Sequence, residues 1–163
     1  MIRDAAPADH APIRAVLLAA FPTPDEADLV ERLRADGDAM VELVIEDAGA
    51  IVGHILFSPL PIERAGAITN AAALAPVSVL PSHQHRGLGA SLVRAGIDIC
   101  RACGCAAVVV LGHPAYYPRF GFAPEAAKAL DAPFSGQAFM ALELVPNALK
   151  GGGKVRYARA FGL

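Results

Sequence analysis

The segment from Val77 to Ala90 combines a strand end, a turn and a helix start, with two glycines at the turn. The first amides of a helix have no partner within the helix and carry partial positive charge, so they form a natural anion site. Gly87 and Gly89 have no side chains, which lets a phosphate group approach the backbone closely. Arg86 could add a charge-assisted contact. These residues indicate a phosphate cradle; glycines that only shape a tight turn and close helix packing are the alternative.

Two other phosphate-binding patterns do not fit this chain. A P-loop needs Gly-x-x-x-x-Gly-Lys-Ser/Thr, and no stretch of the sequence matches it. A dinucleotide fingerprint needs a third glycine in Gly-x-Gly-x-x-Gly, and that position is occupied by Leu92. The usual nucleotide-binding turns are therefore not favoured.

The three cysteines, Cys100, Cys103 and Cys105, crowd into one short stretch, where Cys-x-x-Cys could indicate a metal or redox site. A four-ligand zinc site needs more ligands, yet the chain has no second cysteine pair and only His113 follows nearby. Free cysteines are often small buried hydrophobic residues. We therefore expect packing roles for these cysteines and expect no metal. A metal or redox protein built around them is the weaker alternative.

An α/β framework must position these residues. Apolar residues at helical spacing predict helices from Asp9 to Phe21, from Pro24 to about Gly37 and from Gly87 to about Cys103. Thr23, Pro24 and Glu26 match a capping box at the start of the second helix. The β-prone runs predict strands over Ile2 to Ala5, Met40 to Glu46, Ala50 to Ser58, Ala71 to Leu80, Ala106 to Leu111, Ala138 to Val145 and Lys154 to Phe161.

Three of these elements bear directly on the cradle. Ala106 to Leu111 is continuously apolar, as expected of a strand buried on both faces, and a strand–helix–strand order suggests a parallel pair. Pro76 lies inside the preceding strand and indicates an interruption of its pairing. In the connecting helix, the apolar face is predicted to consist of Leu88, Leu92, Ala95 and Ile99.

Length and composition limit the class of protein. A chain of 163 residues with 55% hydrophobic and 18% charged residues suits one packed domain over residues 1–163. The apolar run Cys105 to Leu111 is far shorter than the roughly 20 residues of a membrane span, and no signal peptide is evident, so a cytoplasmic protein is expected. The net charge of −2 argues against nucleic-acid binding.

Charge is distributed unevenly along the chain. Residues 1–64 hold 12 acidic and 5 basic side chains, whereas residues 65–163 hold 4 acidic and 9 basic ones. A basic half suits an anionic ligand and an acidic half suits a cationic or amine-bearing one. Uneven surface decoration explains the same numbers equally well.

Two motifs resemble the GNAT superfamily of acyl-CoA N-acyltransferases. Gln84-His85-Arg86-Gly87-Leu88-Gly89 is similar to that family's Gln/Arg-x-x-Gly-x-Gly/Ala signature, and Tyr117-Pro118-Arg119-Phe120-Gly121-Phe122 resembles its Tyr-x-x-x-Gly-Phe. The order of predicted elements, including a late hairpin, resembles the family across nearly the whole chain. The resemblance implies a GNAT-like fold: a central, mostly antiparallel sheet with a splayed parallel pair and flanking helices.

The resemblance also implies roles for individual residues. The strands ending near Val79 and Leu111 would splay apart and hold the thioester of acetyl-CoA between them. The pantetheine arm would lie along Val77, Ser78 and Val79. Amides from the turn and helix start would hold the pyrophosphate, namely those of Gln84, His85, Arg86, Gly87, Leu88, Gly89 and Ala90.

Tyr117 matches the family tyrosine that protonates the departing CoA thiolate, a role suited to a phenol. A tyrosine that merely packs against the CoA sulfur and Phe122 is the alternative. Tyr116 is expected to point elsewhere and is the fallback acid. One departure from the family is the connection Gly112 to Tyr116, which is short and contains a proline where many members have a full helical turn carrying an asparagine.

The base that deprotonates the acceptor amine stays open. His54 shares a predicted strand face with Val52 and Leu56 and is expected to be a core histidine. Glu46 is expected to be solvated, and His83 and His85 are expected to shape the phosphate turn. Glu42, His113 and an ordered water are the remaining candidates.

The sequence therefore predicts an N-acetyltransferase that moves the acetyl group of acetyl-CoA to a primary amine of a small molecule or peptide. A non-catalytic acyl-CoA-binding sensor is the main alternative. Contacts to the acceptor are expected from the N-terminal helices and from the loop around Pro59 to Asn70. A homodimer formed through the late strands is an open alternative.

Overall fold

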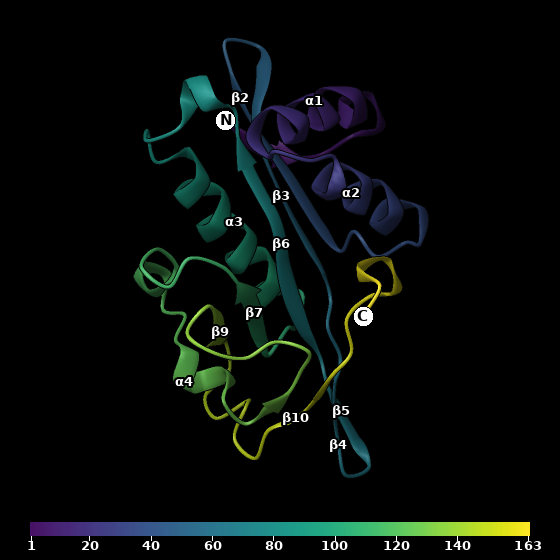
Figure 1. Ribbon diagram of the computed structural model, residues 1–163, viewed down its shortest axis with the longest axis vertical. Helices are drawn as coiled ribbons and strands as arrows, with labels where there is room; N and C mark the ends of the chain where they lie inside the picture. The colour runs from purple at the N-terminus through teal and green to yellow at the C-terminus, as the bar shows by residue number, and fades with distance from the viewer.

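A computed structural model describes all 163 residues, and most of its strands form one six-stranded sheet (Figure 1). The strand order is β1-β2-β3-β6-β7-β9, with β6 and β7 parallel and the other neighbours antiparallel. The strands are β1 (Ile2–Asp4), β2 (Val41–Asp47), β3 (Ala50–Pro59), β6 (Ala71–Val79), β7 (Ala107–Leu111) and β9 (Phe139–Glu143). The predicted fold class, a mostly antiparallel mixed sheet with one parallel pair and flanking helices, is confirmed.

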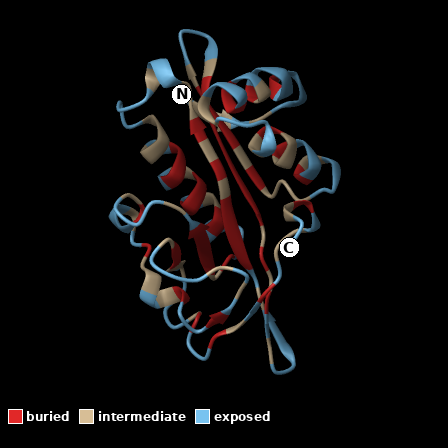
Figure 2. Cartoon of the chain, viewed as in Figure 1, coloured by how far each residue is buried: buried red, intermediate tan, exposed pale blue.

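Helices cover both faces of this sheet (Figure 1). On one face α1 (His10–Ala20) and α2 (Asp25–Ala35) bury apolar residues such as Leu17 and Val30 against Val44 and Leu56 of the sheet. On the other face lies α3 (Leu88–Ala102). Figure 2 shows that the buried residues follow the strands and the inward sides of these helices. No helix has both the length and the apolar character needed to cross a membrane.

The buried face of α3 differs from the predicted one. Leu92 is buried as expected, but its predicted neighbours Leu88, Ala95 and Ile99 are only half-buried on the flank of the helix. The remaining residues that the helix buries are Val93, Gly96, Ile97 and Cys100. Gly96 explains the rotation, because a Cβ there would overlap the ring of Phe57 from β3. The helix therefore turns its smallest side chain toward the largest one on the sheet.

β6 and β7 separate partway along their length. Their parallel pairing runs from Ala71 opposite Ala107 to Leu74 opposite Val110 and then stops, while β6 continues to Val79. On the other edge of β6 the register with β3 shifts between Ile55 and Phe57, so that Ala75 and Pro76 form a bulge. The predicted interruption at Pro76 and the predicted splay between these two strands are both confirmed.

A second, smaller sheet lies at one end of the molecule, in the order β5-β4-β10-β8 (Figure 1). Its strands are β4 (Ile62–Arg64), β5 (Ala67–Thr69), β8 (Leu130–Asp131) and β10 (Gly153–Val155), and α4 (Pro124–Ala127) precedes β8. β10 pairs with β4 and β8 rather than with β9.

The predicted late hairpin is therefore wrong. The open edge of β9 is occupied at Ala141 by Ala123, which leaves no room there for a hairpin partner. The predicted strand from Lys154 to Phe161 also ends early, because Arg159–Phe161 is a 3-10 turn packed near α2.

Candidate functional site

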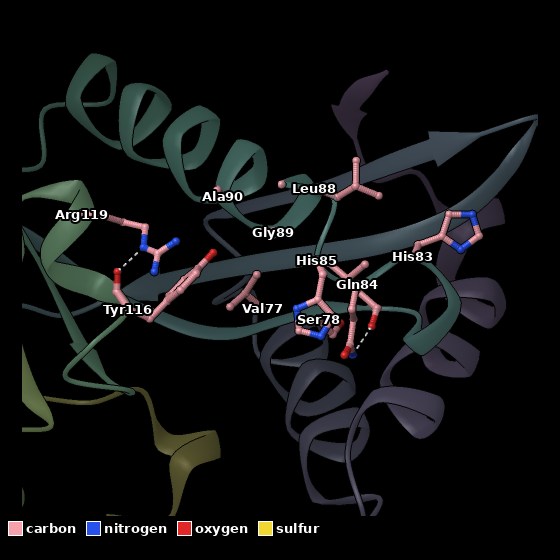
Figure 3. A pocket seen from close by; sticks show the side chains of 12 residues that line it. Val77, Ser78, His83, Gln84, His85, Leu88, Gly89, Ala90, Tyr116 and Arg119 are labelled. Carbon is pink, nitrogen blue, oxygen red and sulfur yellow. Dashed lines mark hydrogen bonds between the residues drawn. The ribbon is translucent and has the colours of Figure 1, made fainter.

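A cavity of about 610 Å³ opens between the end of β6 and the start of α3 (Figure 3). It is lined by nine of the ten residues that the sequence predicts to bind the cofactor: Val77, Ser78, Val79, Gln84, His85, Gly87, Leu88, Gly89 and Ala90. Arg86, the tenth, is exposed and does not line the cavity. The fold thus brings the predicted cradle together around one hollow.

The backbone of the cradle leaves a run of amides free. From His85 to Ala90 no backbone N–H donates a hydrogen bond within the chain. His85 has φ +65° and Gly87, at the start of α3, has φ +79°. Left-handed residues alternating with right-handed ones turn successive N–H groups toward one point and make an anion-binding concavity. The amide of Arg86 belongs to this run even though its side chain lies outside the cavity.

The outer edge of β6 forms one wall. After Leu74 this edge has no strand partner, whereas the other edge still pairs with β3 through Val77 and Val79. The Nε2 group of Gln84 donates a hydrogen bond of 3.0 Å to the carbonyl oxygen of Val79 and so ties the turn to the strand end. An extended ligand could therefore pair with β6 in the place that β7 vacates.

Three further residues complete the cavity: His83, which was expected to shape the phosphate turn, and Tyr116 and Arg119, which sequence reasoning did not assign to it. The prediction that Tyr116 points elsewhere is wrong, because its side chain lines this cavity (Figure 3). Its hydroxyl lies beside Gly89, 3.6 Å from the position that a Cβ on this glycine would occupy. The Arg119 guanidinium stacks over the Tyr116 ring at 4.2 Å and its Nε donates to the Tyr116 carbonyl at 2.8 Å. Arg119 lies within the Tyr117 to Phe122 motif, and its positive charge in a motif expected near the cofactor was the signal that could have identified it.

A second cavity, of about 220 Å³, lies where β6 and β7 separate and faces the α1–α2 connection. It shares Val77 with the larger cavity. Its lining residues are Phe21, Glu26, Leu74, Ala75, Pro76, Val77, Val110, Leu111 and Tyr117. The two cavities therefore share a wall at Val77, where the sheet splays.

Tyr117 is held rigidly in this smaller cavity. Its side chain is 8% exposed, and its ring packs edge-on against Tyr116 at 5.1 Å and Phe122 at 5.8 Å. A Cβ at Gly112, directly after β7, would overlap the Tyr117 ring, so glycine is needed there. Burial, with a smaller contribution from Tyr116, raises the pKa of Tyr117 to about 12. A phenol in this setting keeps its proton at neutral pH and can donate it.

Glu26 is the one acidic side chain that lines the smaller cavity. Its Oε1 is buried and has no hydrogen-bond partner in the chain. The predicted capping box is wrong: α2 begins at Asp25, whose amide reaches Thr23 Oγ1 at 3.4 Å, and Glu26 returns no bond. Because Glu26 was interpreted as a capping residue, it was not considered as a site residue, although the N-terminal helices were expected to contact the acceptor.

Glu42 and His54 form a buried cluster with Arg34. His54 is fully buried, and its Nε2 lies 2.8 Å from Glu42 Oε2, which also accepts a 2.7 Å bond from Arg34 Nη2. Burial alone would raise the pKa of Glu42, but hydrogen bonds from His54 and Arg34 outweigh it and lower the pKa to about 2. Burial lowers the pKa of His54. A carboxylate so strongly stabilised is a poor base.

The other predicted base candidates lie outside both cavities. His113 is exposed, and its carbonyl accepts bonds from the amides of Tyr116 and Tyr117. Glu46 pairs with Arg3 at 2.6 Å on another part of the surface. His54 shares the α1–α2 face with Leu56 but not with Val52, because a β-bulge after Ile45 shifts the alternation.

Two of the three cysteines pack in the core beneath α3, whereas the packing role expected for Cys103 is wrong. Cys100 and Cys105 are buried in the core beneath α3, and Cys103 is exposed. Burial raises the pKa of the Cys100 and Cys105 thiols. No group of three or more His, Cys, Asp or Glu side chains is arranged to hold a metal ion.

Comparisons with known proteins agree with this geometry. The family model described as the acetyltransferase (GNAT) family matches residues 11–122. The uncharacterized N-acetyltransferase YhbS of Escherichia coli K12 is 37% identical over 165 residues, covering 99% of this chain and 98% of YhbS. The uncharacterized N-acetyltransferase YjhQ of the same organism is 41% identical over 129 residues, covering 77% of this chain and 71% of YjhQ.

Solved structures extend the agreement to the fold. The crystal structure of Escherichia coli YhbS in complex with CoA superposes with a TM-score of 0.91 at 36% identity, covering 100% of this chain and 92% of that one. A GNAT family acetyltransferase from Brucella melitensis, solved with acetyl-CoA, gives a TM-score of 0.82 at 36% identity, covering 99% and 97%. The family match over most of the chain, together with relatives alike along nearly their whole length, establishes that this chain belongs to the GNAT family of acetyltransferases.

Proposed function

We propose that this enzyme transfers the acetyl group of acetyl-CoA to a primary amine of a small molecule or peptide, with Tyr117 as the general acid. The observation that carries the proposal is that two cavities lie on either side of Val77, where β6 and β7 separate. One cavity has the free amides of a phosphate cradle, and the other holds Tyr117. A thioester lying in this gap would have its sulfur beside Tyr117 and its carbonyl carbon open to an acceptor from the smaller cavity.

The residues of the larger cavity fit acetyl-CoA. The free amides from His85 to Ala90 match a pyrophosphate, and Gly87 and Gly89 leave no side chain in the way. The unpaired edge of β6 after Leu74 matches the amide groups of a pantetheine arm. The relatives solved with CoA and with acetyl-CoA support the same choice of ligand.

The chemistry is a direct transfer without a covalent enzyme intermediate. The neutral amine nitrogen attacks the thioester carbonyl carbon, the carbon–sulfur bond breaks, and the Tyr117 hydroxyl gives its proton to the departing thiolate. The proton that the amine loses returns, through solvent, to the tyrosine. Overall, an ammonium ion and acetyl-CoA give an acetamide, CoA thiol and one proton. Holding both reactants against one gap removes much of the entropic part of the barrier.

The test is release of free CoA thiol when the enzyme is mixed with acetyl-CoA and a panel of primary amines. Wild type should release thiol with at least one amine, and Tyr117→Phe should release it far more slowly. Tyr157→Phe is the matched control, because Tyr157 is a half-buried tyrosine whose pKa is likewise raised to about 12, but it lines neither cavity. Acetyl-CoA binding without turnover on any amine would instead support a non-catalytic acyl-CoA-binding module.

A further inference from the structure

The Oε1 atom of Glu26 is a buried carboxylate oxygen with no partner in the chain. A buried polar group left without a hydrogen bond is costly, and a charged one more so, so such a group needs an explanation. The arginines that form ion pairs from α1 and α2 are engaged with other carboxylates. Arg14 pairs with Asp28 and Glu31, and Arg34 pairs with Glu42. Glu26 thus brings to the wall of the smaller cavity a carboxylate whose hydrogen-bonding capacity the chain itself does not satisfy.

The rest of that cavity is apolar. Phe21 comes from the α1–α2 connection, and aliphatic side chains from β6 and β7 supply most of the remaining wall, among them Leu74, Val110 and Leu111. Tyr117 contributes an aromatic ring. Glu26 and the Tyr117 hydroxyl are thus the only strongly polar side-chain groups on the lining, and Glu26 is the only one with a charge.

This lining defines the complementary ligand. One carboxylate oxygen matches one ammonium group, and the apolar walls match a hydrocarbon or aromatic arm rather than hydroxyl groups or further charges. The volume of about 220 Å³ corresponds to roughly seven water molecules of liquid, enough for a short arm. A second cation or a set of sugar hydroxyls buried there would find only the Tyr117 hydroxyl as a further partner, which disfavours polyamines and amino sugars.

We propose that the Glu26 carboxylate binds the ammonium group of the acceptor, and that the acceptor is a monoamine carried on a short apolar arm. The inference rests on the proposed acetyl transfer, which it deepens by naming the acceptor class and the residue that selects it. Glu26 and Tyr117 then bracket the reacting atoms from two elements, with the ammonium ion at one and the thiolate at the other. Loss of one proton from the bound ammonium ion to solvent yields the attacking amine.

The test compares wild type with Glu26→Gln, which keeps the shape of the side chain and removes its charge. Asp25→Asn is the matched control, since Asp25 is the preceding residue of α2 and is exposed outside the cavity. The probes are phenethylamine and butylamine as monoamines with apolar arms, spermidine as a polyamine and glucosamine as an amino sugar. Steady-state kinetics give kcat and KM for each amine, and calorimetry gives the affinity for acetyl-CoA.

Wild type and Asp25→Asn should favour the two apolar monoamines over spermidine and glucosamine by at least tenfold in kcat/KM. Glu26→Gln should lose roughly 10- to 100-fold in kcat/KM for phenethylamine, chiefly through KM, with unchanged acetyl-CoA affinity. Two outcomes would overturn the proposal while leaving acetyl transfer intact. One is that Glu26→Gln has the same KM for the amine as wild type, and the other is that wild type prefers the polyamine.

Equilibrium binding of phenethylamine to the CoA-saturated protein separates this inference from catalysis. If no amine is turned over, acetyl transfer fails, yet the ammonium site can still be judged. At least tenfold tighter binding to wild type than to Glu26→Gln supports the site, and equal or absent binding overturns it.

Discussion

Glu26 and Tyr117 line the same cavity of about 220 Å³, one from α2 and the other from the 3-10 turn after β7. The cavity exists because β6 and β7 stop pairing after Leu74 and Val110. A carboxylate and a phenol are thereby placed together where the sheet opens, next to the cavity at the start of α3. This relationship accounts for the chemistry that we propose.

The first prediction concerns the acid. Tyr117→Phe should lower kcat by roughly 10²-fold or more, since general acid catalysis contributes about 10²–10⁴-fold, and acetyl-CoA affinity should not change. In wild type the acid form of Tyr117 persists because burial raises its pKa to about 12. At saturating amine, kcat should therefore not fall between pH 7 and pH 10. A fall with an apparent pKa near 10 would contradict the assignment.

The second prediction concerns the cradle. Gly87→Ala places a side chain at φ +79°, which should strain the turn by about 1–2 kcal/mol and disturb the run of free amides. We expect weaker acetyl-CoA binding by calorimetry and a lower melting temperature. Gly104→Ala is the matched control, because Gly104 has φ +88° at the other end of α3. It should lose stability alone, and equal loss of acetyl-CoA affinity in both variants would argue against the cradle.

The third prediction concerns the position of Tyr117. Because a Cβ at residue 112 would overlap the Tyr117 ring, Gly112→Ala should displace that ring and lower kcat at least tenfold. Acetyl-CoA affinity should be preserved, since Gly112 does not line the larger cavity. Ala115→Ser, an exposed change in the same connection, should leave kcat unchanged. A Gly112→Ala enzyme with normal kcat would show that the acid is a different residue.

The fourth prediction concerns stability and pH. Burial keeps the pKa of His54 below its usual 6.5, so as the pH falls below about 6.5 the unfolded chain takes up a proton before the folded chain does. Glu42, with its pKa lowered to about 2, stabilises the fold above about pH 4.5, and this contribution is lost as the pH falls toward 2. Urea unfolding should therefore show a free energy of unfolding that declines from pH 7 to pH 4. In His54→Gln the decline between pH 7 and pH 5 should flatten; an unchanged slope would contradict this account.

The fifth prediction follows from the unpaired carboxylate. Glu26→Gln removes the charge of a half-buried carboxylate whose Oε1 has no partner, so the substitution should raise the melting temperature while it impairs use of the acceptor. A gain of about 1 kcal/mol corresponds to roughly 2–4 °C for a chain of this size. Differential scanning calorimetry of the protein without amine measures it. A clear loss of stability would mean that Glu26 has a structural partner.

The sequence was most informative where function depends on consecutive residues. The turn from Gln84 to Ala90 could be predicted because its chemistry lies in backbone amides and glycines, which local sequence largely determines. Tyr117 could be identified as a candidate for the same reason, through the motif that ends at Phe122. The parallel pair could be inferred from the apolar run after α3.

What could not be predicted depends on packing between distant segments. The buried face of α3 was predicted wrongly because the ring of Phe57 in β3 packs directly against Gly96, where no side chain is tolerated. The predicted late hairpin is absent because Ala123 pairs with Ala141 at the open edge of β9. Glu26 looked like a capping residue in isolation, and only the separation of β6 from β7 shows that it faces a cavity.

The most direct test of acetyl transfer is a single-turnover reaction with enzyme in excess over acetyl-CoA and a saturating primary amine. Mass spectrometry quantifies the acetylated amine and free CoA over time. The account predicts equal amounts of the two products, with the same stoichiometry and a rate at least about 10²-fold lower in Tyr117→Phe. Acetyl-CoA that remains intact with every amine, or wild-type and Tyr117→Phe enzymes that react at the same rate, would contradict it.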